Sequence, residues 1–492
     1  MNDVIIVGGG PVGLLLAGEL RLAGADPLVL EAAAGAARRN RSFGLRGING
    51  RTSQSLRLRG LTEVLREAQR EMFDALAVKG AADGTDVARG LLHLMKGNRA
   101  RGHFGGLPLV EEESELRPGA AGGFILKQPV LEQILADWAT GLGVRILTNR
   151  EVVDVVQEDS AVRAVLADGR VERAAYLVGC DGGRSVVRKR SGIAFPGTDA
   201  TMTGRVASAE LADPGAVRSS MHGPGGLVNL SLVPGEISTI EFDGGPDDRD
   251  APLTAAELQG SIRRASGVDV TVTRLDDGIR YSDNTRQAAT YRQGRVLLAG
   301  DAAHVHSPIG GQGLNLGLQD AMNLGWKLGL VVRGSAPESL LDTYTAERHP
   351  VGERVLRNTR AQVALMRPGP QSAALREVLA ETLEIPAAKR HFIAMANGID
   401  VDYAPGSEHP LVGRFSPIPV TSENGRALLV APSDEIRAAV NGHAVQVVES
   451  DFEQALLVRP DGYVAWAASD GGTAGLREVL DGWYKAKRSF KM

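Results

Sequence analysis

The run from Gly294 to Leu330 has the composition of a cofactor-binding turn between a strand and a helix. Its short apolar segment Val296–Ala299 ends in Gly300-Asp301, the pattern of a buried strand that stops at a site. A glycine-rich loop follows, and apolar residues then recur at helical spacing, at Leu314, Leu318, Ala321, Leu324 and Leu328. A helix that begins at such a loop offers free backbone N–H groups and its positive dipole end to anionic oxygen. Any four of these residues would fit an ordinary strand–loop–helix connection, but the whole run favours a nucleotide site beside Asp301.

The N-terminal segment carries a dinucleotide-binding fingerprint. Val4–Val7 predicts a buried strand that leads into a helix, and a second strand ends at Glu31. The turn between the first strand and the helix completes G-x-G-x-x-G, with Gly8, Gly10, Val12 and Gly13. In this fingerprint the three glycines permit a tight turn, the approach of a pyrophosphate and the packing of helix on strand. The Glu31 carboxylate is predicted to accept hydrogen bonds from an adenosine ribose, which favours FAD or NAD over NADP as the resident nucleotide.

Further motifs occur along the chain in the order found in one enzyme family. Gln128 opens a Q-x-x-L-E pattern, residues 180–188 match C-D-G-x-x-S-x-x-R, and Gly300-Asp301 matches a GD motif. Together with the N-terminal fingerprint, they make the sequence resemble class A FAD-dependent aromatic monooxygenases, which have the p-hydroxybenzoate hydroxylase-like fold. Within this family the chain most resembles the aromatic polyketide hydroxylases that carry a thioredoxin-like C-terminal domain.

The resemblance implies roles for residues in each motif. Asp301 is expected to hold the ribityl chain of FAD, and Gln128 to contact its phosphate or ribityl region. The loop and helix start are expected to lie against the pyrimidine edge of the flavin, through Pro308, Gly311, Gln312, Gly313, Leu314 and Asn315. Asp181 is expected to fix the backbone of the FAD loop, and in the family it is tied to the use of both FAD and NAD(P)H. Taken alone, Asp181 also fits an aspartate that begins a helix.

The segment from Ala32 to Thr62 contains seven arginines and no acidic residue. A solvated basic face is one interpretation. The other is that one or two of these arginines meet the FAD pyrophosphate or the approaching nicotinamide nucleotide. In the family an arginine near Arg41 touches the cofactor, so Arg41 is the first choice and Arg46 the second.

The activity that the resemblance implies is FAD-dependent, NAD(P)H-driven hydroxylation of a polycyclic aromatic, polyketide-like substrate through a flavin C4a-hydroperoxide, as in antibiotic biosynthesis. Only one complete dinucleotide fingerprint is present, which favours tightly and non-covalently bound FAD, with NADPH or NADH visiting as a transient reductant and O2 as co-substrate. No catalytic side chain is identified, because the flavin performs the oxygen chemistry, and His304 and His306 are expected to be structural. Baeyer–Villiger insertion or an oxidative rearrangement, a flavin reductase without oxygen transfer, and a flavin- or drug-binding protein remain open alternatives.

The expected fold class is α/β: a Rossmann-type FAD-binding domain, an inserted, mostly antiparallel substrate sheet, and a C-terminal thioredoxin-like domain. The predicted limits are 1–75, 100–190 and 275–395 for the FAD-binding domain, 76–99 and 191–274 for the substrate domain, and 400–492 for the C-terminal domain. An apolar floor for a flat substrate is predicted from Met221, Leu227, Leu230, Ile240 and Phe242, although each also fits plain core. Pro350, in a pattern resembling the family's YxxERxP, is expected to start or kink a helix rather than lie inside one. The C-terminal unit has no C-x-x-C, which excludes thioredoxin-type redox activity.

Composition limits the classes of partner. The 492 residues have a formal net charge of −4, which gives no electrostatic case for nucleic acid or an anionic membrane. The single cysteine, Cys180, excludes an intramolecular disulfide framework and has no partners for a metal site. No signal peptide or apolar run of membrane-spanning length is visible. These features predict a cytoplasmic enzyme with a small-molecule substrate, no metal, and a homodimer as a possible assembly.

Overall fold

The computed structural model describes residues 2–34, 43–83, 100–111, 122–218, 220–231, 233, 235–431, 433–440, 443–469 and 472–483. Its largest sheet has the strand order β18-β19-β10-β1-β2-β7, with the hairpin β8–β9 attached through β10. The strands are β1 (Asn2–Val7), β2 (Pro27–Leu30), β7 (Arg145–Leu147), β8 (Val152–Gln157), β9 (Val162–Leu166), β10 (Val171–Gly179), β18 (Arg292–Gln293) and β19 (Val296–Leu298). Strands β19, β10, β1 and β2 are mutually parallel neighbours, so their carboxyl ends share one edge of the sheet. In open parallel sheets this is the edge where ligands bind.

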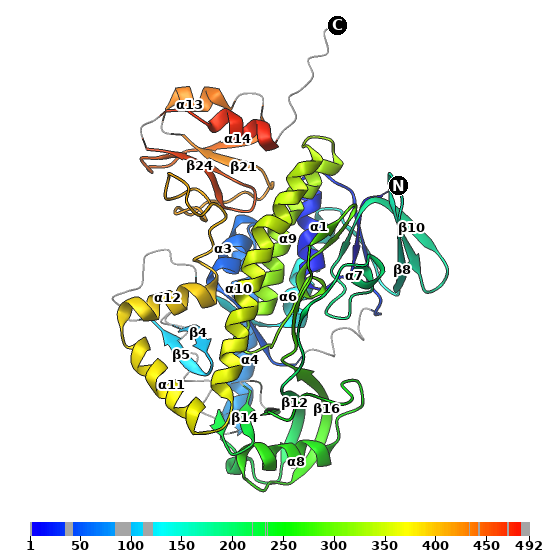
Figure 1. Ribbon diagram of the computed structural model, residues 1–492, viewed down its shortest axis with the longest axis vertical. Coiled ribbons are helices and arrows are strands. Elements are labelled where there is room, and N and C mark those ends of the chain that lie inside the picture. Colours follow the sequence, from blue (N-terminus) through cyan, green and yellow to red (C-terminus); the bar gives the residue numbers. More distant parts are fainter. Residues whose placement is uncertain are drawn as a thin grey trace.

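Helices α1 (Pro11–Leu22) and α9 (Gln312–Val332) pack side by side in the same direction (Figure 1). Glycines of α9 make this close approach possible, because an added Cβ at Gly317 would lie 2.7 Å from Val12 Cγ2 and one at Gly325 would lie 2.3 Å from Glu19 Cβ. These contacts advance together along both helices, so the two N-termini point to the same end of the molecule. Helix α6 (Gln128–Gly141), which begins at the Q-x-x-L-E pattern, packs against α1.

A second sheet is antiparallel, with the order β13-β14-β15-β12-β16. Its strands are β12 (Thr203–Leu211), β13 (Met221–His222), β14 (Gly226–Leu230), β15 (Glu236–Glu241) and β16 (Val272–Ser282). One face packs against α8 (Ala255–Ser266), and the other forms an apolar cluster with Ile309, Val363 and Met366. Leu227, Ile240 and Phe242 lie on this second side, whereas Leu230 packs with the α8 core and Met221 is in neither cluster.

The remaining segments connect and cover these two sheets. They comprise β3 (Leu45–Ile48), α3 (Gly50–Leu58), α4 (Thr62–Asp83), β4 (Ala100–Phe104), β5 (Leu107–Val110), β6 (Phe124–Lys127), α7 (Val186–Arg190), β11 (Gly197–Thr198), β17 (Thr285–Gln287), β20 (His304–Val305), α11 (Pro370–Leu383) and α12 (Pro386–Asn397). The short sheet β11-β17-β20 joins the substrate-side sheet to the loop after β19.

Helix α10 (Asp342–Met366) runs beside α9 and on towards β14 (Figure 1). Pro350 lies inside this helix, so the expectation that it would not lie inside one was wrong. Proline removes one i→i−4 hydrogen bond, but tertiary contacts hold the turn before it. The Tyr344 hydroxyl donates to Leu298 O at 2.8 Å, and Arg348 Nε donates to Asp320 Oδ1 at 2.8 Å.

The C-terminal unit has the strand order β22-β21-β23-β24, in which β21 and β22 are parallel and β23 is antiparallel to both its neighbours. Its elements are β21 (Ala427–Val430), α13 (Asp434–Ala439), β22 (Val445–Val448), β23 (Ala455–Val458), β24 (Val464–Ala468) and α14 (Leu476–Trp483). This order is that of the thioredoxin-like fold predicted from the sequence. The unit packs near the C-terminal end of α9 (Figure 1), where Trp326 and Trp483 meet edge to face with ring centroids 5.4 Å apart.

The α/β fold class predicted from the sequence is therefore confirmed. Among the helices described, none combines the length and the apolar character that crossing a membrane requires.

Candidate functional site at the carboxyl edge of the parallel sheet

The turn after β1 requires glycine at two positions. Gly8 has φ +101°, and an added Cβ would lie 2.4 Å from Cys180 O, so a side chain there would collide with the end of β10. A Cβ at Gly13 would lie 2.0 Å from Gly8 O. Because glycine has no Cβ, the helix can begin this close to the strand. The Glu31 carboxylate lies beside this turn and accepts hydrogen bonds from Gly9 N at 2.8 Å and from Ala33 N at 3.0 Å.

Three segments far apart in the sequence meet around this turn. The end of β10 contacts Gly8 through the backbone of Cys180 and Asp181. The turn after β19 contacts α1, because a Cβ at Gly300 would lie 3.1 Å from Val12 Cγ2. Arg188 ties the second and third segments together, since it donates to Ala302 O and to Gly183 O, each at 2.9 Å. The fingerprint, the Asp181 motif and the Asp301 motif thus form one continuous edge.

The two helices that begin at this edge have uncapped N-termini. The N-cap residues are Gly10 for α1 and Gly311 for α9, with no side-chain cap and no acidic residue in either first turn. Because the helices are parallel, their unpaired N–H groups and positive dipole ends point the same way. This arrangement fits an extended dinucleotide with anionic groups at two places.

Asp301 supplies an acceptor between the two helices. Its side chain is exposed, and none of the described residues forms a hydrogen bond with its carboxylate. The protein around it nevertheless raises the pKa of this carboxyl by desolvation, against the attraction of His304, Arg249 and Arg46. An exposed carboxylate without a hydrogen-bond partner among the described residues is an acceptor that fits the hydroxyls of a ribityl chain.

Arg46 and Gln128 lie near Asp301. Arg46, on β3, donates from Nε to Gln128 Oε1 at 3.1 Å, and Gln128 Nε2 donates to Glu132 Oε1 at 2.9 Å. Burial lowers the pKa of Arg46, while Glu236, Asp301 and Glu132 raise it. Arg41, the first choice for the cofactor arginine, lies outside the described residues. The second choice, Arg46, lies close enough to Asp301 for the charge of each to shift the pKa of the other.

The start of α9 is braced from within the protein. Asn315 accepts from Asn49 N at 2.9 Å and donates to Gly47 O at 2.8 Å and to Gly311 O at 3.0 Å. Gln312 is buried and its Oε1 has no partner among the described residues, whereas Pro308 is exposed. Gly313 packs under the His306 ring, and Leu314 is partly buried against the main core. Asn315 thus fixes the loop, and the free N–H groups of the first turn remain available.

The Asp181 side chain fits the second interpretation, that of an aspartate at the start of a helix. Its Oδ2 accepts from Val186 N at 2.7 Å and Val187 N at 3.1 Å, so the side chain supports the start of α7 beside the N-cap residue Ser185. Its Oδ1 is buried without a partner among the described residues, and burial raises the pKa of the carboxyl. Contact with the FAD loop is made by the backbone, at the Gly8 turn.

Both histidines of the loop have structural contacts. His304 Nε2 lies 2.7 Å from Asp320 Oδ2, and both residues are fully buried. His306 Nδ1 lies 2.8 Å from Ser307 O, and burial lowers the pKa of His306 to about 4. Asp320 also receives Gly300 N and Arg348, and sequence reasoning missed this hub. Its only local signal is an acidic residue in the apolar middle of a helix, followed by the arginine of the α10 motif.

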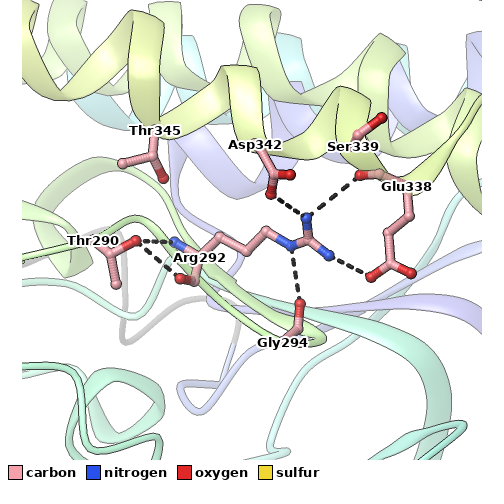
Figure 2. Close-up of a pocket in the computed structure, with 7 residues that line it drawn as sticks. All are labelled: Thr290, Arg292, Gly294, Glu338, Ser339, Asp342 and Thr345. Carbon is pink, nitrogen blue, oxygen red and sulfur yellow. Dashed lines mark hydrogen bonds and ion pairs between the residues drawn. The ribbon is translucent and has the colours of Figure 1, made fainter.

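A surface hollow at the other end of β19 carries no such chemistry. It is lined by Thr290, Arg292, Gly294, Glu338, Ser339, Asp342 and Thr345 (Figure 2). The Arg292 guanidinium already bonds the polar groups that line the hollow: Asp342 Oδ1 at 2.6 Å, Gly294 O at 3.0 Å and Glu338 (Figure 2). It lies next to the start of β19, away from Gly300 and Asp301. Among the described residues no group of histidine, cysteine, aspartate and glutamate side chains fits a metal ion.

Comparison with known proteins agrees with this geometry. The sequence model of the FAD binding domain family matches residues 1–359, and that of the aromatic-ring hydroxylase C-terminal region matches residues 409–486. Rifampicin monooxygenase from Streptomyces venezuelae is 40% identical over 501 residues, which cover 96% of each chain. Dialkyldecalin synthase from Streptomyces rugosporus is 34% identical over 504 residues, covering 98% of this chain and 99% of that one.

The solved structure of OxyS, an anhydrotetracycline hydroxylase from Streptomyces rimosus, matches with a TM-score of 0.83 and 35% identity over 99% of both chains. The match extends over the parallel sheet, the second sheet and the C-terminal unit alike. The chain therefore belongs to the class A flavoprotein monooxygenases, as a FAD-dependent aromatic-ring hydroxylase with the C-terminal region of that family.

Proposed function

We propose that this monooxygenase oxygenates a polycyclic aromatic, polyketide-like small molecule, with FAD bound along the carboxyl edge of the parallel sheet. The observation that carries the proposal is the continuity between this edge and the apolar side of the antiparallel sheet. Ile309, in the loop between Asp301 and α9, packs in one cluster with Leu227 and Ile240 of that sheet. A flat substrate on the sheet would therefore lie next to the loop that borders the flavin.

The residues assigned to FAD are those whose geometry fits its parts. The N-terminus of α1 at Gly10 would hold the pyrophosphate, Glu31 the adenosine ribose and Asp301 the ribityl chain. Arg46 and Gln128 would contact the phosphate or ribityl region. The N-terminus of α9 would stabilise negative charge at the pyrimidine edge of the reduced flavin. When bound, FAD supplies the redox chemistry, as it accepts a hydride from NADPH or NADH and uses O2 to transfer one oxygen atom.

The protein itself positions the substrate and excludes water from the site. The apolar cluster of Met202, Leu227, Ile240, Ile309, Val363 and Met366 offers a dry surface rather than an acid or base. The compounds in the names of two relatives, rifampicin and anhydrotetracycline, are large aromatic molecules that suit such a surface. They are the substrates to test first.

One relative favours a second candidate. Dialkyldecalin synthase shares the full length of the chain and is named for a different reaction. A flavin-binding protein that shapes a substrate without transferring oxygen therefore competes with oxygenation. Baeyer–Villiger insertion is the third outcome, and the position of the new oxygen in the product distinguishes it from hydroxylation.

The test is reconstitution with FAD followed by turnover. The purified protein should be yellow, and rifampicin or anhydrotetracycline should accelerate both NADPH oxidation and O2 uptake, with a product heavier by one oxygen atom. Asp301→Asn, with weakened FAD binding, is the matched negative control. Failure to bind FAD overturns the proposal, and FAD binding without accelerated NADPH oxidation favours the synthase-like alternative.

The remaining expectations concern the setting of the enzyme. A reducing compartment such as the cytoplasm is supported by the single cysteine, Cys180, whose thiol pKa burial raises well above its ordinary value. The net charge of −4 supports the absence of nucleic-acid partners. A homodimer stays a prediction for sedimentation or light scattering.

A further inference from the structure

One row of residues crosses the side of the antiparallel sheet that faces Ile309, Val363 and Met366. The register pairs Leu227 with Ile240, Ile240 with Gly204, and Gly204 with Tyr281. Directly paired residues of antiparallel strands point to the same face. Tyr281, on β16, therefore shares its face with Leu227 and Ile240, the residues that pack against Ile309 of the cofactor loop.

The missing side chain of Gly204 lets the Tyr281 ring lie across the sheet. An added Cβ at Gly204 would be 2.1 Å from Tyr281 Cζ, the ring carbon that carries the hydroxyl. The ring thus extends from β16 over β12, towards Ile240, and packs partly buried against the apolar cluster. The phenol brings a polar group to the row in which Leu227 and Ile240 are apolar.

This hydroxyl has no hydrogen-bond partner among the described residues. Buried tyrosine hydroxyls usually find one, as Tyr344 does at Leu298 O and Tyr291 at Gln287 Nε2, each at 2.8 Å. The Tyr463 hydroxyl also has no partner within the described part of the chain but is enclosed, whereas that of Tyr281 still reaches solvent. A phenol that is open on one side and unpaired is available to a ligand.

We propose that Tyr281 orients the substrate, by donating a hydrogen bond from its hydroxyl to a phenolic or carbonyl oxygen of a polycyclic aromatic molecule lying on the sheet. This inference rests on the proposed function and adds a specificity-determining residue to it. An aromatic skeleton stacked on apolar side chains has little to fix its rotation in the plane. One directional hydrogen bond at the rim selects which ring carbon faces the flavin.

The protonation state of Tyr281 agrees with this role. Desolvation by the surrounding protein raises the pKa of Tyr281 to about 12, so the hydroxyl remains protonated in the neutral range and acts as a donor. A substrate oxygen that is itself ionised would strengthen the bond, because hydrogen bonds to charged groups are shorter and stronger.

The primary test is Tyr281→Phe, which keeps the ring over Gly204 and removes only the hydroxyl. With rifampicin and anhydrotetracycline as probes, we expect the Kd, read from the flavin absorbance change, and the KM to rise about 5- to 10-fold. Coupling should fall, so that a larger share of the NADPH oxidised yields hydrogen peroxide rather than product. FAD content and Tm should equal those of the wild type, which a merely structural role for the hydroxyl would not predict.

A second variant displaces the same hydroxyl without removing it. Gly204→Ala places a methyl group where the Tyr281 ring lies, so the ring must swing away although its hydroxyl is intact. The φ of Gly204 lies outside the range that favours glycine, so the backbone accepts alanine. Loss of coupling in both variants supports the inference. Tyr176→Phe is the matched control, because Tyr176 lies buried in β10 of the other sheet, and it should change neither Kd nor coupling.

Failure of this inference differs from failure of the proposed function. If the wild type binds and oxygenates a probe while Tyr281→Phe has the same Kd, KM and coupling, Tyr281 does not orient the substrate and the proposed function stands. If the FAD-loaded wild type binds neither probe, the proposed substrate class is wrong, and the inference falls with it.

Discussion

The buried carboxylate of Asp320 accepts a hydrogen bond from the backbone N–H of Gly300 at 3.1 Å. Asp320 lies on α9, whereas Gly300 immediately precedes Asp301 at the end of β19, so one carboxylate fixes the turn that presents the other. His304 at 2.7 Å and Arg348 at 2.8 Å complete its set of donors. Burial alone would raise the pKa of Asp320, but Arg348 and His304 hold it below its ordinary value. The presentation of Asp301 is therefore coupled to α9 and α10.

Asp320→Asn is expected to lower both stability and FAD affinity. The substitution keeps the size of the side chain but leaves Arg348 without its charged partner, and breaking a buried ion pair costs about 3–5 kcal/mol. Urea unfolding measures the first effect and FAD titration of the apoprotein the second. Glu19→Gln is the control, since Glu19, on α1, also forms a buried ion pair, at 2.5 Å from Arg59. It should lose similar stability and keep its FAD affinity; equal losses of affinity would contradict the positioning role of Asp320.

Asp301→Asn is expected to weaken FAD binding without destabilising the apoprotein. Asp301 is exposed and unbonded by the described residues, so its removal breaks no contact in the fold. Hydrogen bonds to a charged group contribute about 1.5–3 kcal/mol, so the Kd of FAD should rise about 10- to 100-fold. Flavin retention after desalting and calorimetric titration measure it. Asp277→Asn, another exposed aspartate, should leave the Kd unchanged; an unaltered flavin content in Asp301→Asn would remove the ribityl assignment.

Stability should fall on the acid side because of His306. Imidazole titrates near pH 6.5 in the unfolded chain, whereas burial lowers the pKa of His306 to about 4 in the folded chain. Between these values the unfolded state binds the extra proton, so the free energy of unfolding decreases as pH falls from about 6.5 to about 4. His306→Gln removes this titrating group. The difference in free energy of unfolding between the variant and the wild type should therefore change by up to about 3 kcal/mol between about pH 6.5 and about pH 4.

Urea unfolding at several pH values measures this shift. His391→Gln, at an exposed histidine, is the control. A constant difference between His306→Gln and the wild type across the window would show that His306 titrates normally.

Arg459→Met is expected to release the C-terminal unit from α9 and α10. Arg459 bonds both oxygens of Glu347 at 2.8 Å and Asp461 Oδ1 at 3.0 Å, and Lys327 reaches Glu347 at 2.9 Å. Removing the arginine leaves buried carboxylates short of one cation, at a cost of about 3–5 kcal/mol. Limited proteolysis between residues 397 and 425 should accelerate. Arg414→Met is the control. It breaks the 3.5 Å ion pair between Arg414 and Asp402, in which the arginine side chain is exposed, and it should not change the cleavage rate.

Local patterns made some features predictable. Gly13 follows from sterics within a few residues, since a Cβ there would meet Gly8 O, and Gly8 follows from the positive φ of the turn. The helical spacing of apolar residues from Leu314 to Leu328 placed α9, which the structure extends from Gln312 to Val332. The fold class and the family rest on such motifs occurring in order along the chain.

Other features depend on which segments pack together. Pro350 lies inside α10 because Tyr344 and Arg348, in the turns before it, bond Leu298 O and Asp320 outside the helix, and no local rule contains those contacts. Leu227 and Leu230 belong to opposite faces of one sheet, since side chains alternate along a strand and only the register reveals which face meets Ile309.

The sequence by itself determined the separate pieces: a glycine turn, an aspartate after each of two strands, and a glycine loop that starts a helix. Only the tertiary structure decided how the pieces act together. It assigned the Asp181 side chain to the start of α7, left Asp301 open, buried Asp320 as the support behind it and laid Tyr281 over Gly204. The physical reason is that motifs record the steric and hydrogen-bonding needs of neighbouring residues, whereas strand register and helix packing set distances between residues far apart in the chain.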